Sequence, residues 1–131
     1  MSKMTISPRF CETDANGHIN NVAFAAWFET GRLSYLELLD ERSNSSKSVW
    51  LLASVRMDYL LEVFYGEDIE VEVVAARLGR SSLQLECRMH RAEELVLKGR
   101  ARVVYVGEDN KPCSIPNSLR HAIEDDVTVK H

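Results

Sequence analysis

The chain has 131 residues, of which 45% are hydrophobic and 27% are charged, and its formal net charge at pH 7 is −4. This length predicts a single domain over residues 1–131 that can bury one core. The acidic balance and the lack of a basic cluster argue against nucleic acid and anionic membranes as main partners.

The N-terminal residues and the cysteines indicate a cytoplasmic protein. No apolar run reaches the roughly 18 residues of a membrane-spanning helix, and residues 1–5 lack the apolar region of a signal peptide. Cys11, Cys87 and Cys113 are odd in number and far apart, which fits a reducing compartment. The histidines are equally scattered, so the sequence predicts no metal site.

The first elements are a short strand and a long helix. Residues 4–10 alternate weakly and contain Pro8, which predicts an edge strand or one that ends early. Either Asn20 or Asn21 is expected to cap a helix from Val22 to Leu39, because a short side-chain oxygen can accept from the free amides of the first turn. Apolar residues cover most of this helix, which favours burial on nearly every side.

Strands follow the polar loop at 40–47. Residues 49–65 are rich in valine, leucine and aromatic residues, and this length predicts a bend or bulge. Three more segments alternate apolar and polar residues, as expected for antiparallel strands with one solvated face: 69–73, 83–90 and 95–105. A short helix is predicted over 114–124, with Pro116 in its first turn.

This order of elements predicts an α+β fold. The packing solution is a curved antiparallel sheet of about five strands wrapped around one long central helix. Four valines would then leave apolar patches on the outer face of the sheet: Val74, Val96, Val104 and Val106. We therefore expect a homodimer or homotetramer.

Residues 14–18 carry the chemistry of the predicted site. Asp14, Asn16 and His18 precede a helix N-terminus, and Gly17 permits a backbone conformation closed to other residues. The first amides of a helix lack internal partners and lie at the positive end of its dipole. They can stabilise an oxyanion, and the same field favours a charged Asp14 carboxylate.

A thioester is the carbonyl compound that needs the least further help. A carboxylate such as Asp14 can attack a polarised carbonyl or deprotonate a water that does. A thiolate, with a conjugate pKa of about 8.5, leaves without strong protonation. One carboxylate and one oxyanion site, formed around Gly17, Asn20 and Asn21, are then sufficient.

Each of these residues also has a plain structural interpretation. Asp14 can be a turn residue, Asn16 can close an Asx turn, and His18 can support the loop. Asn20 and Asn21 can be helix caps. Glu29, a second acid on the long helix, is expected to form an ion pair with Arg32 or Arg56, or an interface contact.

The stretch 14–22 reads D-A-N-G-H-I-N-N-V and precedes an aromatic-rich helix. Together with Ser54–Tyr59 and Tyr65–Asp68, it resembles the hotdog-fold thioesterases, in the 4-hydroxybenzoyl-CoA thioesterase branch that includes plant acyl-carrier-protein thioesterases. The resemblance implies a hotdog fold, with Asp14 as the catalytic nucleophile or general base. It also implies that Asn16 and His18 correspond to the Asn and His that accompany this carboxylate in the plant-type members.

The resemblance implies an acyl-CoA thioesterase that releases free acid and coenzyme A, with coenzyme A as part of the substrate and no other cofactor. Four residues at a predicted turn could hold its phosphates, or could simply be a solvated turn: Arg77, Arg80, Ser81 and Ser82. The alternatives are a non-catalytic acyl-CoA-binding or sensing protein and a thioesterase acting on acyl carrier protein. The chain departs from some members, which carry Tyr where Phe10 stands, and it lacks the H-G-G segment of the sister branch.

Overall fold

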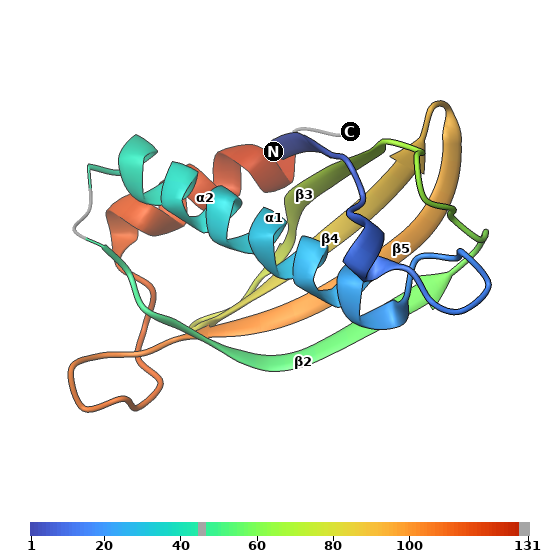
Figure 1. Cartoon of the computed structure of the whole chain (residues 1–131). Helices are drawn as coiled ribbons and strands as arrows, with labels where there is room; N and C mark the ends of the chain where they lie inside the picture. Colours follow the sequence, from blue (N-terminus) through green and yellow to red (C-terminus); the bar gives the residue numbers. More distant parts are fainter. Residues whose placement is uncertain (45–46, 129–131) are drawn as a thin grey trace.

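The computed structural model describes residues 1–44 and 47–128, and its five strands form one antiparallel sheet. The elements in chain order are β1 (Ser2–Ile6), the 3-10 helix η1 (Phe10–Glu12), α1 (Asn21–Arg42), β2 (Trp50–Tyr59), β3 (Ile69–Leu78), β4 (Ser82–Arg91), β5 (Glu94–Tyr105) and α2 (Asn117–Thr128). The strand order is β1-β3-β4-β5-β2 (Figure 1), which confirms the α+β class and the number of strands.

Two glycines allow α1 to lie close to the sheet. A Cβ atom at Gly31 of α1 would stand 2.9 Å from Cγ2 of Val73 on β3, and one at Gly99 of β5 would stand 2.9 Å from Cε2 of Phe28. Real Cβ contacts are not this short, so a larger residue at either position would force Val73 or the Phe28 ring to shift. The close approach buries Phe28 completely and forms the centre of the core.

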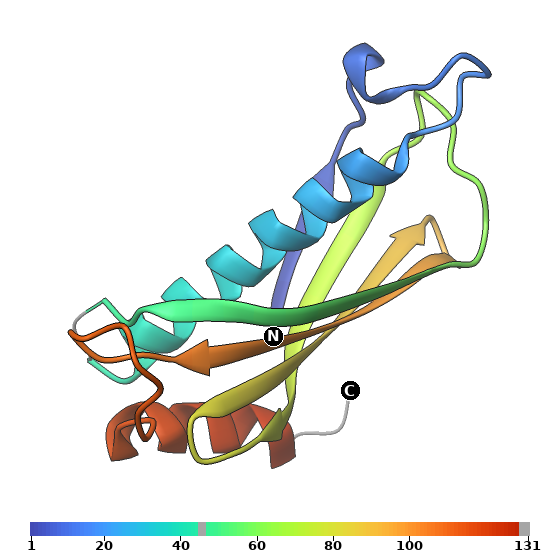
Figure 2. The ribbon, with the colours of Figure 1, turned by 90° about the horizontal axis from the view of Figure 1, so that it is seen from below.

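The long helix is only partly covered, in contrast to the prediction of a helix enclosed by the sheet. It packs chiefly along β1, β3 and α2 (Figure 2), while Val22 and Leu33 on its other side are exposed. With 22 residues it is longer than predicted, because it continues to Arg42. No helix in the described part of the chain is long and apolar enough to cross a membrane.

Several element boundaries differ from the prediction. β1 ends at Ile6, before Pro8, as the proline suggested. β2 contains the expected irregularity, a register shift between Leu52 and Ser54, but it ends at Tyr59 rather than at residue 65. The chain turns there because the backbone N–H groups of residues 60 and 61 both donate to the carbonyl oxygen of residue 96, at 2.9 and 3.2 Å.

Two further predictions are wrong, one on exposed valines and one on the start of α2. Val96 and Val106, predicted on the exposed outer face, are 1% and 3% exposed. The carbonyl oxygen of Val96 accepts from the N–H groups of residues 60 and 61, and Val106 forms a β-bridge with Pro112. Pro116 directly precedes α2 rather than lying in its first turn, and its carbonyl oxygen accepts from the N–H of Arg120 at 2.8 Å.

A group of exposed apolar residues lies along β2, at one edge of the sheet, and in the segments on either side of it. These side chains are between 43% and 54% exposed: Val49, Leu51, Leu52, Val55, Tyr59, Leu60, Leu61, Phe64 and Tyr65. A long edge strand with apolar side chains exposes unpaired backbone groups and apolar area together, which favours pairing with another chain.

A buried polar contact fixes α2 against α1. The Asp126 carboxylate, in a residue only 9% exposed, accepts from Tyr35 Oη at 2.6 Å and from Arg42 Nη1 at 2.9 Å. Tyr35 Oη in turn accepts from the backbone N–H of Ala75 on β3 at 3.2 Å. Burial opposes the charge of Asp126, but the hydrogen bonds from Tyr35, from the N-terminal ammonium of Met1 at 2.9 Å and from Arg42 hold its pKa below the ordinary value.

We expect Asp126→Asn to make the free energy of unfolding less dependent on pH in acid. Because the native pKa is lowered, the carboxylate stabilises the fold fully above its unfolded pKa of about 3.9 and loses that contribution as the pH falls through the native pKa. The variant should be roughly 1–2 kcal/mol less stable at pH 7. Thermal unfolding from pH 7 to 3 should show this gap closing below about pH 4; a constant gap would contradict the assignment.

Candidate functional site

The loop from Thr13 to Asn20 joins η1 to α1 and is closed by backbone hydrogen bonds. The Asn20 N–H donates to the Glu12 carbonyl oxygen at 2.8 Å, and the Asp14 N–H donates to the His18 carbonyl oxygen at 2.7 Å. Gly17 has a φ of 80°, in the left-handed region where glycine is favoured. The loop is therefore a short turn whose two ends meet at the N-terminus of α1.

Asp14 has a structural role in this turn and retains a free oxygen. Its Oδ1 accepts from the backbone N–H of Asn16 at 2.8 Å and of His18 at 3.1 Å, which forms the Asx turn that the sequence allowed. Oδ2 has no hydrogen bond within residues 1–44 and 47–128, and the residue is exposed. The turn thus fixes the carboxylate and leaves one oxygen available for chemistry.

Asp14 and the N-terminus of α1 share one cavity. The cavity has a volume of about 240 Å³ and is lined by Asp14, His18, Ile19, Asn21, Phe24, Tyr59, Leu60, Leu61, Glu62 and Val63. Apart from Asp14, His18, Asn21 and Glu62, the lining is aromatic or aliphatic. The cavity therefore brings together a carboxylate, a helix N-terminus and apolar walls.

The cap of α1 leaves two amides available at this cavity. Asn20 is the N-cap, because its Oδ1 accepts from the N–H of Ala23 at 2.8 Å. The backbone N–H groups of Asn21 and Val22 have no acceptor among the described residues, since the first amides of a helix lack an internal partner. Asn21 lines the cavity, so this end of the helix, with the amide of Asn21, can stabilise negative charge there.

His18 has a partner that sequence reasoning missed. Its Nε2 lies 3.3 Å from Glu62 Oε2, and its ring contacts Phe64 edge-on with 4.6 Å between centroids. The backbone joins the same two segments, because the Ile19 N–H donates to the Val63 carbonyl oxygen at 2.8 Å. No sequence signal could identify Glu62, since it stands alone in an apolar run that the pattern assigned to a strand.

Other predicted residues lie outside this cavity. Asn16 contributes its backbone N–H to the turn, but its side chain is not part of the lining. Glu29 is exposed and lies 4.0 Å from Arg32 Nη2, in agreement with the expected ion pair. Arg32 itself is 8% exposed and lies over the Phe28 ring, 4.6 Å from its centroid. Glu29 is not part of the cavity lining.

The predicted phosphate-binding residues are at the opposite end of the sheet. Arg77 lies near the end of β3, and Arg80, Ser81 and Ser82 form the turn into β4 (Figure 2). β3 begins near the Asp14 loop and runs for ten residues, or roughly 30 Å, towards this turn. Arg80 Nε donates to Ser114 Oγ at 2.9 Å. The chain therefore does not bring these four residues together with Asp14.

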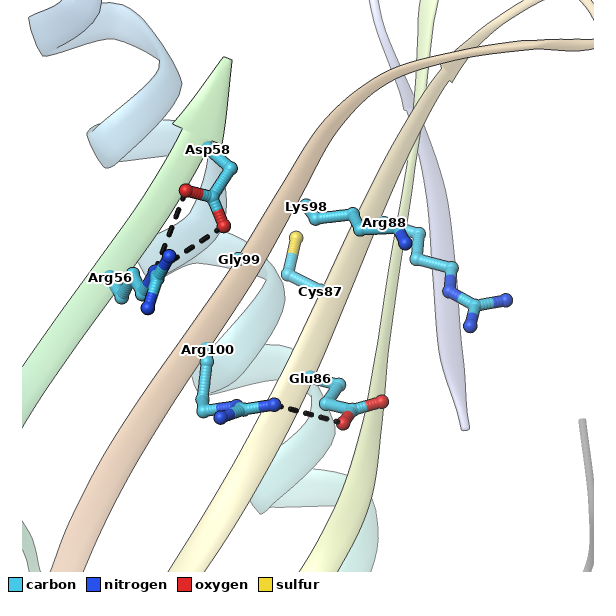
Figure 3. A pocket seen from close by; sticks show the side chains of 8 residues that line it. All are labelled: Arg56, Asp58, Glu86, Cys87, Arg88, Lys98, Gly99 and Arg100. Atoms are coloured by element: carbon cyan, nitrogen blue, oxygen red, sulfur yellow. Dashed lines mark hydrogen bonds and ion pairs between the residues drawn. The ribbon is translucent and has the colours of Figure 1, made fainter. Parts of the chain in front are cut away.

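A larger hollow of about 340 Å³ lies on the outer face of the sheet, away from α1 (Figure 3). Its side chains are mostly charged, and two ion pairs cross it: Arg56 Nε to Asp58 at 3.4 Å and Arg100 Nη2 to Glu86 at 4.0 Å. It offers no apolar wall for an acyl group and no helix N-terminus, so its chemistry differs from that of the Asp14 cavity.

One group of potential metal ligands occurs among the described residues. Ligand atoms of Glu70, Glu72 and His90 lie within 4.8 Å of one another on the outer face of β3 and β4. Lys3 Nζ stands 3.6 Å from Glu70 and 3.3 Å from Glu72, so an ammonium group already balances these carboxylates. We interpret the group as a surface ion-pair cluster, away from Asp14.

Comparison with known proteins identifies the family. Residues 8–123 match the family model of the thioesterase-like superfamily. The chain belongs to this superfamily. This confirms the resemblance to hotdog thioesterases, while assignment to the 4-hydroxybenzoyl-CoA branch stays a prediction.

Two solved structures and one further relative are similar to this chain. A predicted thioesterase from Bacillus stearothermophilus has a similar structure, with a TM-score of 0.87 and 29% identity over 99% of this chain and 98% of that one. A thioesterase from Thermus thermophilus, complexed with coenzyme A and Zn, has a TM-score of 0.83 and 26% identity over 99% and 96% of the two chains. The uncharacterized protein YsmA of Bacillus subtilis (strain 168) is 39% identical over 80 residues, 61% of this chain and about half (54%) of its own length.

We expect substitution of the two asparagines at the start of α1 to have different effects on the stability of the protein. Asn20→Ala should lower the free energy of unfolding by about 1 kcal/mol, because it removes the cap on Ala23. Asn21→Ala, at the next position but without a side-chain hydrogen bond among the described residues, should change it by less than about 0.5 kcal/mol. Urea denaturation measures both, and equal losses would refute the assignment of the cap.

Proposed function

We propose that this member of the thioesterase-like superfamily hydrolyses acyl-coenzyme A to a free acid and coenzyme A, with Asp14 as the reacting carboxylate. One observation carries the proposal: Asp14 lines the same apolar-walled cavity as Asn21 at the N-terminus of α1. The family supports thioester hydrolysis. The thermophilic relative complexed with coenzyme A supports the choice of thiol.

In this mechanism the thioester carbonyl oxygen lies against the free amides of Asn21 and Val22. Their N–H groups and the dipole of α1 stabilise the oxyanion as it forms. Asp14 Oδ2 either attacks the carbonyl carbon, giving an anhydride that water then hydrolyses, or takes a proton from the attacking water. In both routes the carbon–sulfur bond breaks and coenzyme A leaves as a thiolate, which solvent protonates.

His18 and Glu62 complete the polar side of the cavity in this proposal. His18 Nε2 lies 3.3 Å from Glu62 Oε2, so the other ring nitrogen, Nδ1, is the one we assign to the ligand side. That nitrogen can bind the hydrolytic water or the amide of the pantetheine arm. The side chain of Asn16 does not line the cavity, so it does not contact the substrate in this proposal.

The same proposal includes a homodimer formed through β2. The strand is one of the two edges of the sheet, and its exposed apolar side chains, which include Val55 and Tyr59 on the α1 side, are about half exposed. Tyr59, Leu60 and Leu61 belong both to this exposed surface and to the lining of the Asp14 cavity. A second copy at this edge would therefore cover apolar area and close the cavity at once.

We expect Asp14→Asn to lower the rate of thiol release from acyl-CoA by at least about 100-fold, because the amide neither attacks nor accepts a proton. Glu29→Gln, which removes the other candidate acid, should keep the rate within about twofold, since Glu29 has no contact with the cavity. A thiol reagent measures both, across short, medium, long and aromatic acyl chains.

The controls distinguish the alternatives. Circular dichroism should show that both variants fold. Full activity of Asp14→Asn would overturn the site assignment, and loss of activity in Glu29→Gln would transfer the role to Glu29. A wild-type protein that binds acyl-CoA tightly without releasing thiol would support a binding or sensing protein, and one that acts only on acyl carrier protein would change the substrate.

We expect Val55→Asp to convert the dimer to a monomer. The residue is 49% exposed on the α1 side of β2, so a charge there would be buried without a partner only in the dimer. Ser54→Asp, the neighbouring position on the outer face, is the matched control and should leave the dimer intact. Light scattering after size exclusion gives the mass; a monomeric wild type at micromolar concentration would refute the interface.

A further inference from the structure

Glu12 is a buried carboxylate two residues before Asp14. It is 7% exposed, and its side chain bonds to groups that hold the loop. Oε1 accepts from the backbone N–H of Arg9 at 2.8 Å and lies 3.4 Å from Arg9 Nε. Oε2 accepts from the indole N–H of Trp27 on α1 at 2.9 Å. Burying a carboxylate is costly unless its oxygens are hydrogen-bonded, and both oxygens of Glu12 have donors.

The backbone of Glu12 holds the other side of the same loop. Its carbonyl oxygen accepts from the N–H of Asn20 at 2.8 Å, and Asn20 is the residue that caps α1. The side chain of Glu12 thus binds the second turn of α1, while its main chain binds the residue before the first turn. Asp14 lies in the short loop between Glu12 and Asn20, and Glu12 bonds this loop to α1 through both its side chain and its main chain.

The protonation state of Glu12 suits a permanent contact. Burial opposes ionisation, but the hydrogen bonds from the Arg9 backbone, Trp27 and the Arg9 side chain together hold the pKa of the carboxyl below its ordinary value. Glu12 is therefore charged at neutral pH and accepts from all three donors. It does not line the Asp14 cavity, so it has no contact with substrate there.

Trp27 connects this contact to the wall of the cavity. Its ring packs edge-on against Phe24, with 5.2 Å between centroids, and Phe24 packs against Tyr59 at 5.7 Å. Phe24 and Tyr59 both line the cavity. The Glu12–Trp27 hydrogen bond therefore links the position of the loop to the position of the apolar wall.

We propose that Glu12 is a positioning residue that holds Asp14 in register with the N-terminus of α1 by bonding Trp27 and Asn20 at the same time. The inference rests on the proposed function for its effect on catalysis. Glu12 sets where the Asp14 carboxylate stands relative to the free amides of Asn21 and Val22. Displacements of about 1 Å in such an arrangement cost up to about 100-fold in rate.

The test is Glu12→Gln, which keeps the shape of the side chain but turns an NH₂ group towards one of its donors. We expect kcat for thiol release to fall about 10- to 100-fold, with KM within about threefold, because substrate binding does not involve Glu12. Trp27→Phe should give a smaller fall. The double variant should be no slower than Glu12→Gln alone, because the two changes remove one shared interaction.

The matched control is Asp126→Asn, a second buried carboxylate that fastens α2 far from Asp14. It should lose stability but keep kcat within about twofold. Hydrogen exchange gives a readout without substrate: the amides of Asp14, Asn16 and His18 should exchange at least about tenfold faster in Glu12→Gln and unchanged in Asp126→Asn.

Each outcome decides the proposal. A folded Glu12→Gln with wild-type kcat and wild-type loop exchange overturns it, as does an equal fall in kcat in Asp126→Asn. If Glu12→Gln does not fold, Trp27→Phe decides on the same two readouts. If the wild type releases no thiol, the proposed function fails, while loop exchange alone still tests whether Glu12 positions Asp14.

Discussion

The site depends on an unavoidable property of helices, namely that the first amides of α1 have no carbonyl partner within the helix. The Asn20 side chain satisfies one of them, on Ala23, and leaves those of Asn21 and Val22 for another acceptor. The preceding loop returns to this point through the Glu12–Asn20 backbone bond, which brings the Asp14 carboxylate to the same cavity. A carboxylate and an anion-stabilising end are thus assembled within a short stretch of chain.

The rest of the fold determines what lies opposite this end. β2 is an edge strand, and α1 lies towards the other edge, on β1 and β3. Phe24 of α1 reaches Tyr59 of β2, with 5.7 Å between ring centroids. The segment after β2 then bends across the end of β5, where residues 60 and 61 bond to Val96, and forms the apolar wall. The position of α1 thus leaves apolar side chains of β2 exposed beside the Asp14 cavity, where we propose that the acyl group binds.

The sequence predicts those parts of the structure that depend on local patterns. Period-two alternation places Ile69, Val71 and Val73 inward, and the structure buries them completely or nearly so. The Asn20 cap and the irregularity near Leu52 also follow from local chemistry and strand length. The end of β2 does not, because apolar residues continue to Tyr65 while the backbone bonds of residues 60 and 61 are to a distant strand.

The candidate site likewise has one part that a local motif indicates and another part that only the folded chain brings together. Asp14, His18 and the start of α1 lie close together in sequence, so a single motif indicates them, whereas Glu62 contacts His18 from a distant segment. Glu12 and Trp27 are close enough in sequence to be noticed, but a glutamate outside any predicted helix gives no sign of being buried. Its charge is tolerated only because three donors converge on it, and that convergence is a property of the packed loop and helix together. Asp14, which we propose as the catalytic carboxylate, is fixed by an exposed turn. In this proposal the precision of its position comes from a buried neighbour such as Glu12.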